Sequence, residues 1–115
     1  MRWFWQRERK PRREKTIPEG AVRRHLRFTG KVQSVGFRFT AQSWAEQRGL
    51  TGWVTNLSDG DVELEVQGTP EQIDAFLGDV AAESAREKAF IHARLVQNDP
   101  IEPIPDDRFT IRNLY

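Results

Sequence analysis

The chain has 115 residues, of which 37% are hydrophobic and 30% charged, and its formal net charge at pH 7 is +1. This length suits one globular domain with its own core. The absence of cysteine excludes disulfides, thiol catalysis and thiolate metal sites. No apolar stretch reaches the roughly 20 residues of a membrane-spanning helix, and the N-terminus lacks the apolar core of a secretory signal. We therefore expect a cytoplasmic protein.

The charges are divided unevenly between the first 20 residues and the rest. Residues 1–20 hold seven Lys or Arg and three Glu, a net charge of +4, whereas the remaining residues carry 11 basic and 14 acidic side chains. A Pro-Glu-Gly sequence at 18–20 marks the change in composition. We expect residues 1–20 to form a basic, flexible extension and residues 21–115 to form the folded domain.

The first regular pattern begins at Ala21 and predicts a strand followed by a helix. Leu26, Phe28 and Val32 share one parity, which is typical of a half-buried strand. Apolar residues then recur at i, i+4, i+7 and i+8, the spacing of one helix face: Phe37, Ala41, Trp44 and Ala45.

A strand pair and a second helix come next. Residues 51–57 and 62–67 have strand patterns, and the Ser-Asp-Gly-Asp sequence at 58–61 between them is a hairpin turn signal. The second helix has a strong start signal. Thr69 suits the N-cap, Pro70 suits the first helical position, and Gln72 completes a capping box.

The chain ends with two further strands. We expect one strand after Lys88 through Val96, then a loop with three prolines, then a short strand at 109–111. The element order is strand, helix, strand, strand, helix, strand, with an added terminal strand. This order favours an α+β fold in which two helices cover one face of a single sheet.

Residues 30–38, with the sequence Gly-Lys-Val-Gln-Ser-Val-Gly-Phe-Arg, lie between the first strand and the first helix. In a tight strand-to-helix loop, backbone N–H groups converge on one point and the helix dipole adds partial positive charge. An arginine at the start of the helix supplies a forked pair of donors. The stretch therefore predicts an anion site.

These nine residues resemble the phosphate-loop signature of the acylphosphatase family. A second stretch, 49–56 (Gly-Leu-Thr-Gly-Trp-Val-Thr-Asn) followed by 59–63 (Asp-Gly-Asp-Val-Glu), is similar to that family's second signature. The two blocks have the family's order and spacing, and the resemblance covers roughly residues 23–112. It implies that residues 21–115 are an acylphosphatase-like domain. Members of this family are ferredoxin-like α/β sandwiches, so the resemblance implies a βαββαβ order with an antiparallel sheet and both helices on one face. They hydrolyse the carboxyl–phosphate anhydride of acyl phosphates without a metal or a cofactor.

The resemblance also implies residue roles. Arg38 corresponds to the arginine that binds phosphate, and Asn56 to the asparagine that positions the attacking water. These roles suit the reaction, because an acyl phosphate has a good leaving group, so that catalysis consists of positioning and electrostatics. Backbone N–H groups of the loop would hold the other phosphate oxygens, and they belong to Gln33, Ser34, Val35, Gly36, Phe37 and Arg38.

The chain departs from the family pattern in two places. Ser34 stands where the family usually has glycine, and a positive φ there would strain the loop by roughly 1 kcal/mol. After the second helix, residues 83–87 replace a Gly-Pro pair that many members carry, which leaves the register of the fourth strand open.

Two other functions stay open on the sequence. The basic extension with Trp3, Phe4 and Trp5 could bind a nucleic-acid backbone or an anionic membrane, and RNA-recognition domains use the same sandwich. Against this, the strand at 62–65 reads Val-Glu-Leu-Glu, which repels phosphates. In the other alternative, Ser34 spoils the loop and the domain senses anions without catalysis. We expect a monomer whose partner is a small acyl phosphate.

Overall fold

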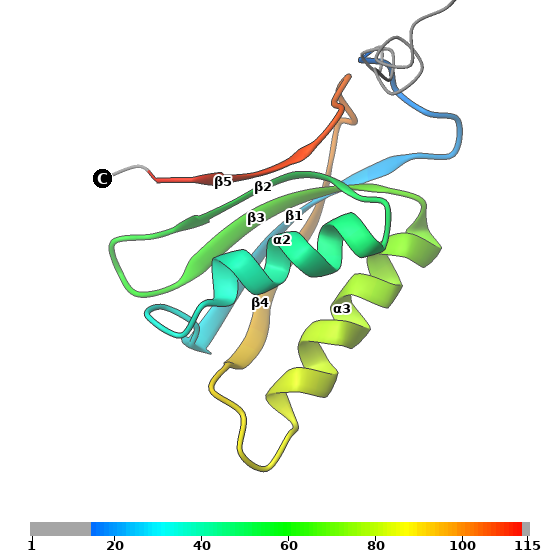
Figure 1. The fold of residues 1–115 in the computed structure, drawn as a ribbon. Helices are drawn as coiled ribbons and strands as arrows, with labels where there is room; N and C mark the ends of the chain where they lie inside the picture. The colour runs from blue at the N-terminus through cyan, green and yellow to red at the C-terminus, as the bar shows by residue number, and fades with distance from the viewer. Residues whose placement is uncertain (1–14, 114–115) are drawn as a thin grey trace, which may run out of the picture.

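The strands and helices follow the order expected from the sequence, in two layers (Figure 1). The computed structural model describes residues 15–113, so that most of the predicted basic extension lies outside the described residues. The elements are β1 (Val22–Lys31), α2 (Phe37–Gln47), β2 (Thr51–Asn56), β3 (Val62–Gly68), α3 (Pro70–Ser84), β4 (His92–Ile101) and β5 (Phe109–Arg112).

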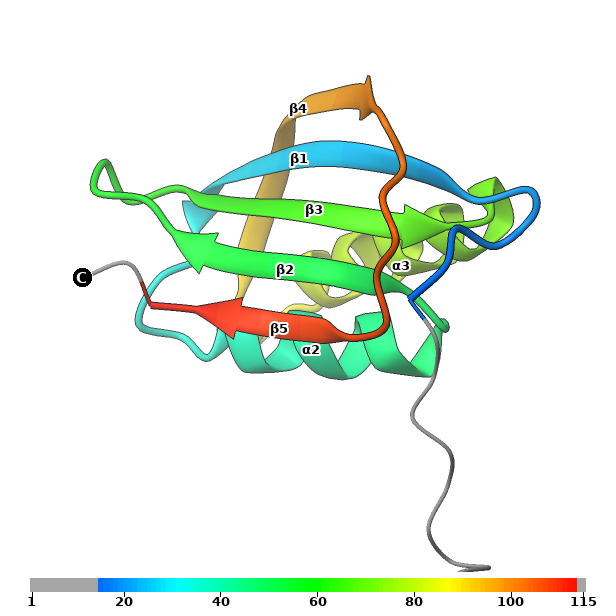
Figure 2. The same ribbon diagram turned by 90° about the horizontal axis from the view of Figure 1, so that it is seen from above.

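The sheet has five strands in the order β4-β1-β3-β2-β5. The predicted antiparallel pairing is confirmed for β1 with β3, β1 with β4, and β2 with β3. It is wrong for the last pair, because β5 runs parallel to β2. The connection after β4 crosses the sheet face that carries no helix (Figure 2). Gln67 holds this connection, since its Nε2 donates to the Ile104 carbonyl at 2.7 Å and its Oε1 accepts from the Ile104 N–H at 2.9 Å.

β4 differs from its predicted bounds at both ends. It begins at His92, and it continues to Ile101 through Pro100, which we had expected in a loop. Pro100 pairs with Arg24 of β1, which settles the register that the sequence left open. β4 is an edge strand, where proline is tolerated because one side of the strand needs no partner.

Both helices cover the same face of the sheet (Figure 1). Apolar side chains of the strands and helices form one core between the layers. The predicted start of α3 is confirmed, since Thr69 Oγ1 accepts from the Gln72 N–H at 3.2 Å and Gln72 Oε1 accepts from the Thr69 N–H at 2.8 Å. Across residues 15–113, neither helix is long and apolar enough to cross a membrane.

An ion pair joins Arg48, the residue after α2, to Asp79 of α3 and makes the stability depend on pH. Arg48 Nε and Nη2 donate to the Asp79 carboxylate at 2.9 and 2.7 Å. The hydrogen bond from Arg48 lowers the pKa of Asp79 from its usual 3.8. A carboxyl whose pKa is lower in the folded state contributes stability above pH 3.8, and this contribution is lost as the pH falls through the folded-state pKa.

We therefore expect Asp79→Asn to lower the urea midpoint slightly at pH 7 and by less at about pH 2, because the carboxylate that pairs with Arg48 is lost as the pH falls through its lowered pKa. The measurement is urea unfolding at the two pH values. Asp74→Asn, on the exposed side of the same helix, is the matched control and should match the wild type at both. An equal deficit of Asp79→Asn at both pH values would contradict the ion-pair explanation.

Candidate functional site

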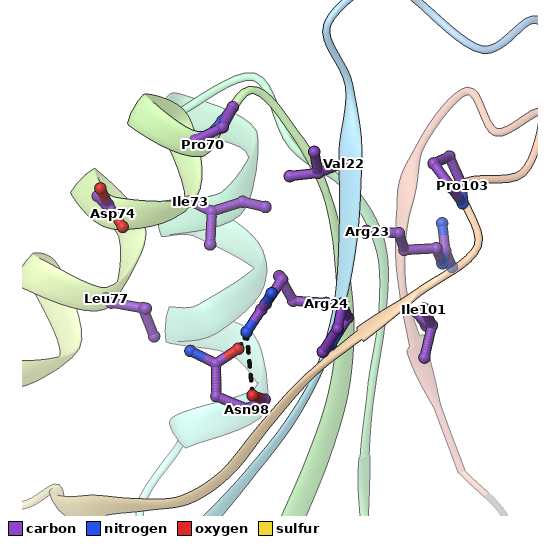
Figure 3. A pocket seen from close by; sticks show the side chains of 11 residues that line it. Val22, Arg23, Arg24, Pro70, Ile73, Asp74, Leu77, Asn98, Ile101 and Pro103 are labelled. Carbon is purple, nitrogen blue, oxygen red and sulfur yellow. Dashed lines mark hydrogen bonds between the residues drawn. The ribbon is translucent and has the colours of Figure 1, made fainter.

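One cavity lies at the end of β1 remote from residues 30–38 (Figure 3). It has a volume of about 410 Å³ between β1, β4 and the start of α3. Arg24 reaches into it and donates to Asn98 Oδ1 at 2.7 Å and to the Asn98 carbonyl at 3.0 Å. The other walls are largely apolar and include Val22, Ile73, Leu77 and Ile101. This cavity contains none of the predicted site residues.

A smaller pocket, of about 130 Å³, lies where the 30–38 loop meets the end of β2. It brings together residues that are far apart in the sequence, including the two predicted catalytic side chains. Gln33 and Val35 of the predicted loop do not line it, and Arg38 supplies the only formal charge of its wall. The lining residues are Val32, Ser34, Gly36, Phe37, Arg38, Phe39 and Asn56.

The N-terminus of α2 has backbone N–H donors that no hydrogen bond among the described residues uses. Gly36 is the N-cap with φ 78°, and no side chain caps the helix or adds an acidic group to its first turn. By contrast, Thr69 caps α3 and Glu71 lies in its first turn. The hydrogen bonds found within residues 15–113 use none of the backbone N–H groups of residues 33–38. Such an uncapped helix start is suited to an anion.

The loop is held at both of its ends. Phe37 is buried and packs edge-to-face on Phe28 of β1, with ring centroids 5.6 Å apart, which fixes the start of α2 on the sheet. At the other end, Gln33 Nε2 donates to the carbonyls of Leu57 at 2.7 Å and Asp61 at 2.8 Å. The side chain of Gln33 therefore connects the loop to the β2–β3 hairpin. The sequence had predicted a contact only for its backbone N–H, with phosphate.

Arg38 projects from the first turn of α2 and is half-buried. Its Nη1 donates to Asn113 Oδ1, and within residues 15–113 it forms no ion pair with a carboxylate. A neutral acceptor orients a guanidinium without cancelling its charge. Sequence reasoning missed Asn113, although it lies only two residues after the strand predicted at 109–111.

Asn56 is the last residue of β2 and lines the same pocket as Arg38. Its Oδ1 is buried and has no hydrogen-bond partner within the described part of the chain. Buried side-chain acceptors in proteins are nearly always satisfied, so an unpaired one requires an explanation. An acceptor in this position can receive a hydrogen bond from a water molecule or a ligand in the pocket.

Neither histidine lies at this pocket. His25 Nε2 is 2.9 Å from Glu63 Oε2 on the helix-free face, and His92 Nδ1 is 3.2 Å from the Ser84 carbonyl. Within residues 15–113, no three His, Asp or Glu side chains are grouped as metal ligands would be.

Ser34 has φ 62°, so the condition for a strained loop is met. The left-handed region costs an L-residue about 1–2 kcal/mol, more than the roughly 0.5–1 kcal/mol of chain entropy that glycine costs. We expect Ser34→Gly to raise the free energy of unfolding by up to about 1 kcal/mol, measured by urea denaturation. Ser43→Gly, an exposed position inside α2, should lower it by contrast. Destabilisation by both variants would show that Ser34 is not strained.

Comparison with known proteins agrees with this geometry. The family model described as Acylphosphatase matches residues 24–111. A curated relative from Thermococcus kodakarensis, named Acylphosphatase, is 49% identical over 57 residues, which cover 50% of this chain and 63% of that protein. One from Bordetella parapertussis, with the same name, is 53% identical over 53 residues, 46% of this chain and 56% of that protein. The chain thus spans about three fifths of the length of these curated relatives.

A solved structure extends the likeness over the whole domain. The acylphosphatase structure from Coxiella burnetii is 31% identical, has a TM-score of 0.61, and is matched over 82% of this chain and 95% of its own. A second, from Bacillus subtilis, is 26% identical with a TM-score of 0.63 over 80% and 99% of the two chains. On the family match, supported by these likenesses, the chain belongs to the acylphosphatase family.

Proposed function

We propose that this protein is an acylphosphatase, which hydrolyses the carboxyl–phosphate anhydride of an acyl phosphate to a carboxylate and phosphate. The observation that carries the proposal is the buried, unpartnered Oδ1 of Asn56 in the pocket that Arg38 also lines. An acceptor for water and a donor for phosphate thus share one small space. Family membership and the names of the curated relatives support the same activity.

In this proposal the phosphoryl group binds to the loop and to Arg38. Backbone N–H groups of the loop residues that line the pocket donate to its oxygens, and these residues are Ser34, Gly36, Phe37 and Arg38. The guanidinium supplies two parallel donors together with a full positive charge. Negative charge spreads over the phosphoryl oxygens as the reaction proceeds. Donors that are already fixed in place stabilise this charge without reorganising. Asn113 holds the guanidinium ready for this contact.

Asn56 positions the nucleophile. A water molecule donates a hydrogen bond to its Oδ1 and attacks phosphorus, forming a new P–O bond. The bond between phosphorus and the acyl oxygen breaks, and its electron pair leaves on the carboxylate. The pocket wall has no Asp, Glu, His or Lys to accept the proton of the water. A phosphoryl oxygen therefore takes this proton.

The absence of a general acid in the pocket wall sets the substrate class. A carboxylate is a weak base and leaves without a proton, whereas an alkoxide leaving from an ordinary phosphate ester needs one. We therefore propose that acyl phosphates are cleaved and alkyl phosphates such as glycerol phosphate are not. The side chains at the pocket supply what the first reaction needs, namely phosphate donors and a water acceptor.

The test is phosphate release from acetyl phosphate by the purified chain in the presence of EDTA. We expect turnover that inorganic phosphate inhibits competitively and no release from glycerol phosphate. Phosphate binding without turnover would favour the alternative of a non-catalytic anion sensor with a spoiled loop at Ser34. Turnover that depends on an added divalent metal would contradict the proposed roles of Arg38 and Asn56.

A cytoplasmic location and a monomeric state remain predictions from the sequence. Binding of nucleic acid or an anionic membrane was predicted for the basic extension, and residues 1–14 of that extension lie outside the described residues.

A further inference from the structure

We propose that Phe39 is a specificity-determining residue whose ring contacts the acyl group of the substrate and selects apolar, in particular aryl, acyl phosphates. The inference rests on the proposed acylphosphatase activity and adds a substrate class to it. It starts from an exposed aromatic side chain that neither the fold nor the resemblance accounts for.

The fold gives Phe39 no packing role. It occupies the third position of α2, whose buried residues are Phe37, Ala41 and Ala45. Phe39 itself is 71% exposed. A phenyl ring at this position contributes little to the core, and isolated exposed apolar residues are common on protein surfaces. What sets Phe39 apart is its place in the wall of the candidate site.

The pocket has a polar part and an apolar part. Arg38, Asn56 and the start of α2 supply the polar part, whereas Val32, Phe37 and Phe39 supply apolar wall. An acyl phosphate has the same division, with a dianionic head joined to an acyl group that is apolar in many compounds. The charged head has its partners in the polar part, which leaves the apolar wall for the acyl group.

The size of the pocket places the acyl group at its mouth. Pockets that enclose a whole drug-sized ligand have volumes of about 300–1,000 Å³, whereas this one has about 130 Å³. It therefore takes the phosphoryl head and leaves the acyl group at the rim. Of the large apolar side chains that line the pocket, that of Phe39 is highly exposed, whereas Phe37 is buried. An acyl group at the rim therefore covers the Phe39 ring. Aromatic rings associate most favourably with other aromatic or apolar groups.

The test compares benzoyl phosphate with acetyl phosphate in the wild type and in Phe39→Ala. We expect the variant to lose about tenfold in kcat/KM for benzoyl phosphate, mostly through a higher KM, and to change by less than about twofold for acetyl phosphate. Phe39→Tyr keeps the ring and should retain the wild-type ratio. Phe90→Ala is the matched control, because Phe90 is 72% exposed and does not line the pocket.

The outcomes separate this inference from the function on which it rests. If the wild type hydrolyses both substrates and Phe39→Ala leaves their ratio unchanged, the specificity role is wrong and the acylphosphatase activity stands. An equal loss on both substrates, with a raised inhibition constant for inorganic phosphate, would instead assign Phe39 to the shape of the phosphate site and overturn the inference. If the wild type hydrolyses neither substrate, the proposed function itself fails.

Discussion

Arg38→Ala is expected to lower kcat/KM for acetyl phosphate by about 1,000-fold or more. The guanidinium is the only formal charge in the wall of the pocket, and it has no carboxylate partner among residues 15–113. Its removal leaves the phosphoryl dianion without a cationic partner in the pocket wall. The same variant should bind inorganic phosphate more weakly, which isothermal titration calorimetry or competitive inhibition can measure.

The shape of the guanidinium should matter as well as its charge. Arg38→Lys keeps a cation but loses the planar fork and the contact geometry with Asn113, so a loss of about 100-fold is expected. Added guanidinium ion should partly restore turnover to Arg38→Ala and not to Arg38→Lys, whose side chain still occupies the space. Arg86→Ala removes an exposed arginine of the segment after α3 and serves as the control. Wild-type activity in Arg38→Ala would remove Arg38 from the site.

Local sequence signals predicted most of the fold because each depends on a few neighbouring residues. The capping box at Thr69 and Gln72 formed as expected, since its two hydrogen bonds join groups three residues apart. The strand-helix order follows from periodicity in the same way. The direction of β5 was not predictable on these grounds, because it depends on the path of the 102–108 connection across the sheet. The path of such a connection leaves no periodic pattern of apolar residues in the sequence.

Part of the lining of the candidate pocket could also be predicted from the sequence. The loop at 30–38 and Asn56 were found through motifs, and Asn56 lines one pocket together with part of this loop. Asn113 and the Gln33 side chain were missed because their partners lie 75, 24 and 28 residues away, so their contacts exist only after the chain has folded. Phe39 carried no signal, since an exposed phenylalanine in the sequence looks the same as a buried one.

The loop and Asn56 differ in how the rest of the fold holds them. This difference decides whether a mutation there can separate an effect on activity from an effect on stability. The proposed phosphate-binding loop is supported by contacts that also stabilise the fold, such as Phe37 against Phe28 and Gln33 against the hairpin. Variants at these positions change stability and activity together and therefore say little about chemistry. The proposed water-binding group, Asn56, makes no hydrogen bond through its Oδ1 within the described residues. At this position the effects of a mutation on stability and on activity can therefore be separated.

Asn56→Ala should abolish most turnover while leaving the protein at least as stable as the wild type. A buried acceptor without a partner costs about 1–3 kcal/mol, and its removal offsets the packing lost with the side chain. We expect the free energy of unfolding to stay level or to rise by up to about 1 kcal/mol. We expect kcat/KM for acetyl phosphate to fall by about 100- to 1,000-fold, because the attacking water loses its orientation.

Asn98→Ala provides the opposite case within the same protein. Asn98 Oδ1 accepts a hydrogen bond from Arg24 at 2.7 Å, remote from the site, so its loss should lower stability slightly and leave kcat/KM unchanged. Urea unfolding and the acetyl phosphate assay should be applied to both variants. We expect Asn56→Ala to lose activity and keep its stability, and Asn98→Ala to lose stability and keep its activity. A clear loss of stability in Asn56→Ala would mean that its oxygen is satisfied in solution by a structural partner. The case for Asn56 as the residue that orients water would then fail, since a satisfied acceptor is not free to receive the nucleophile.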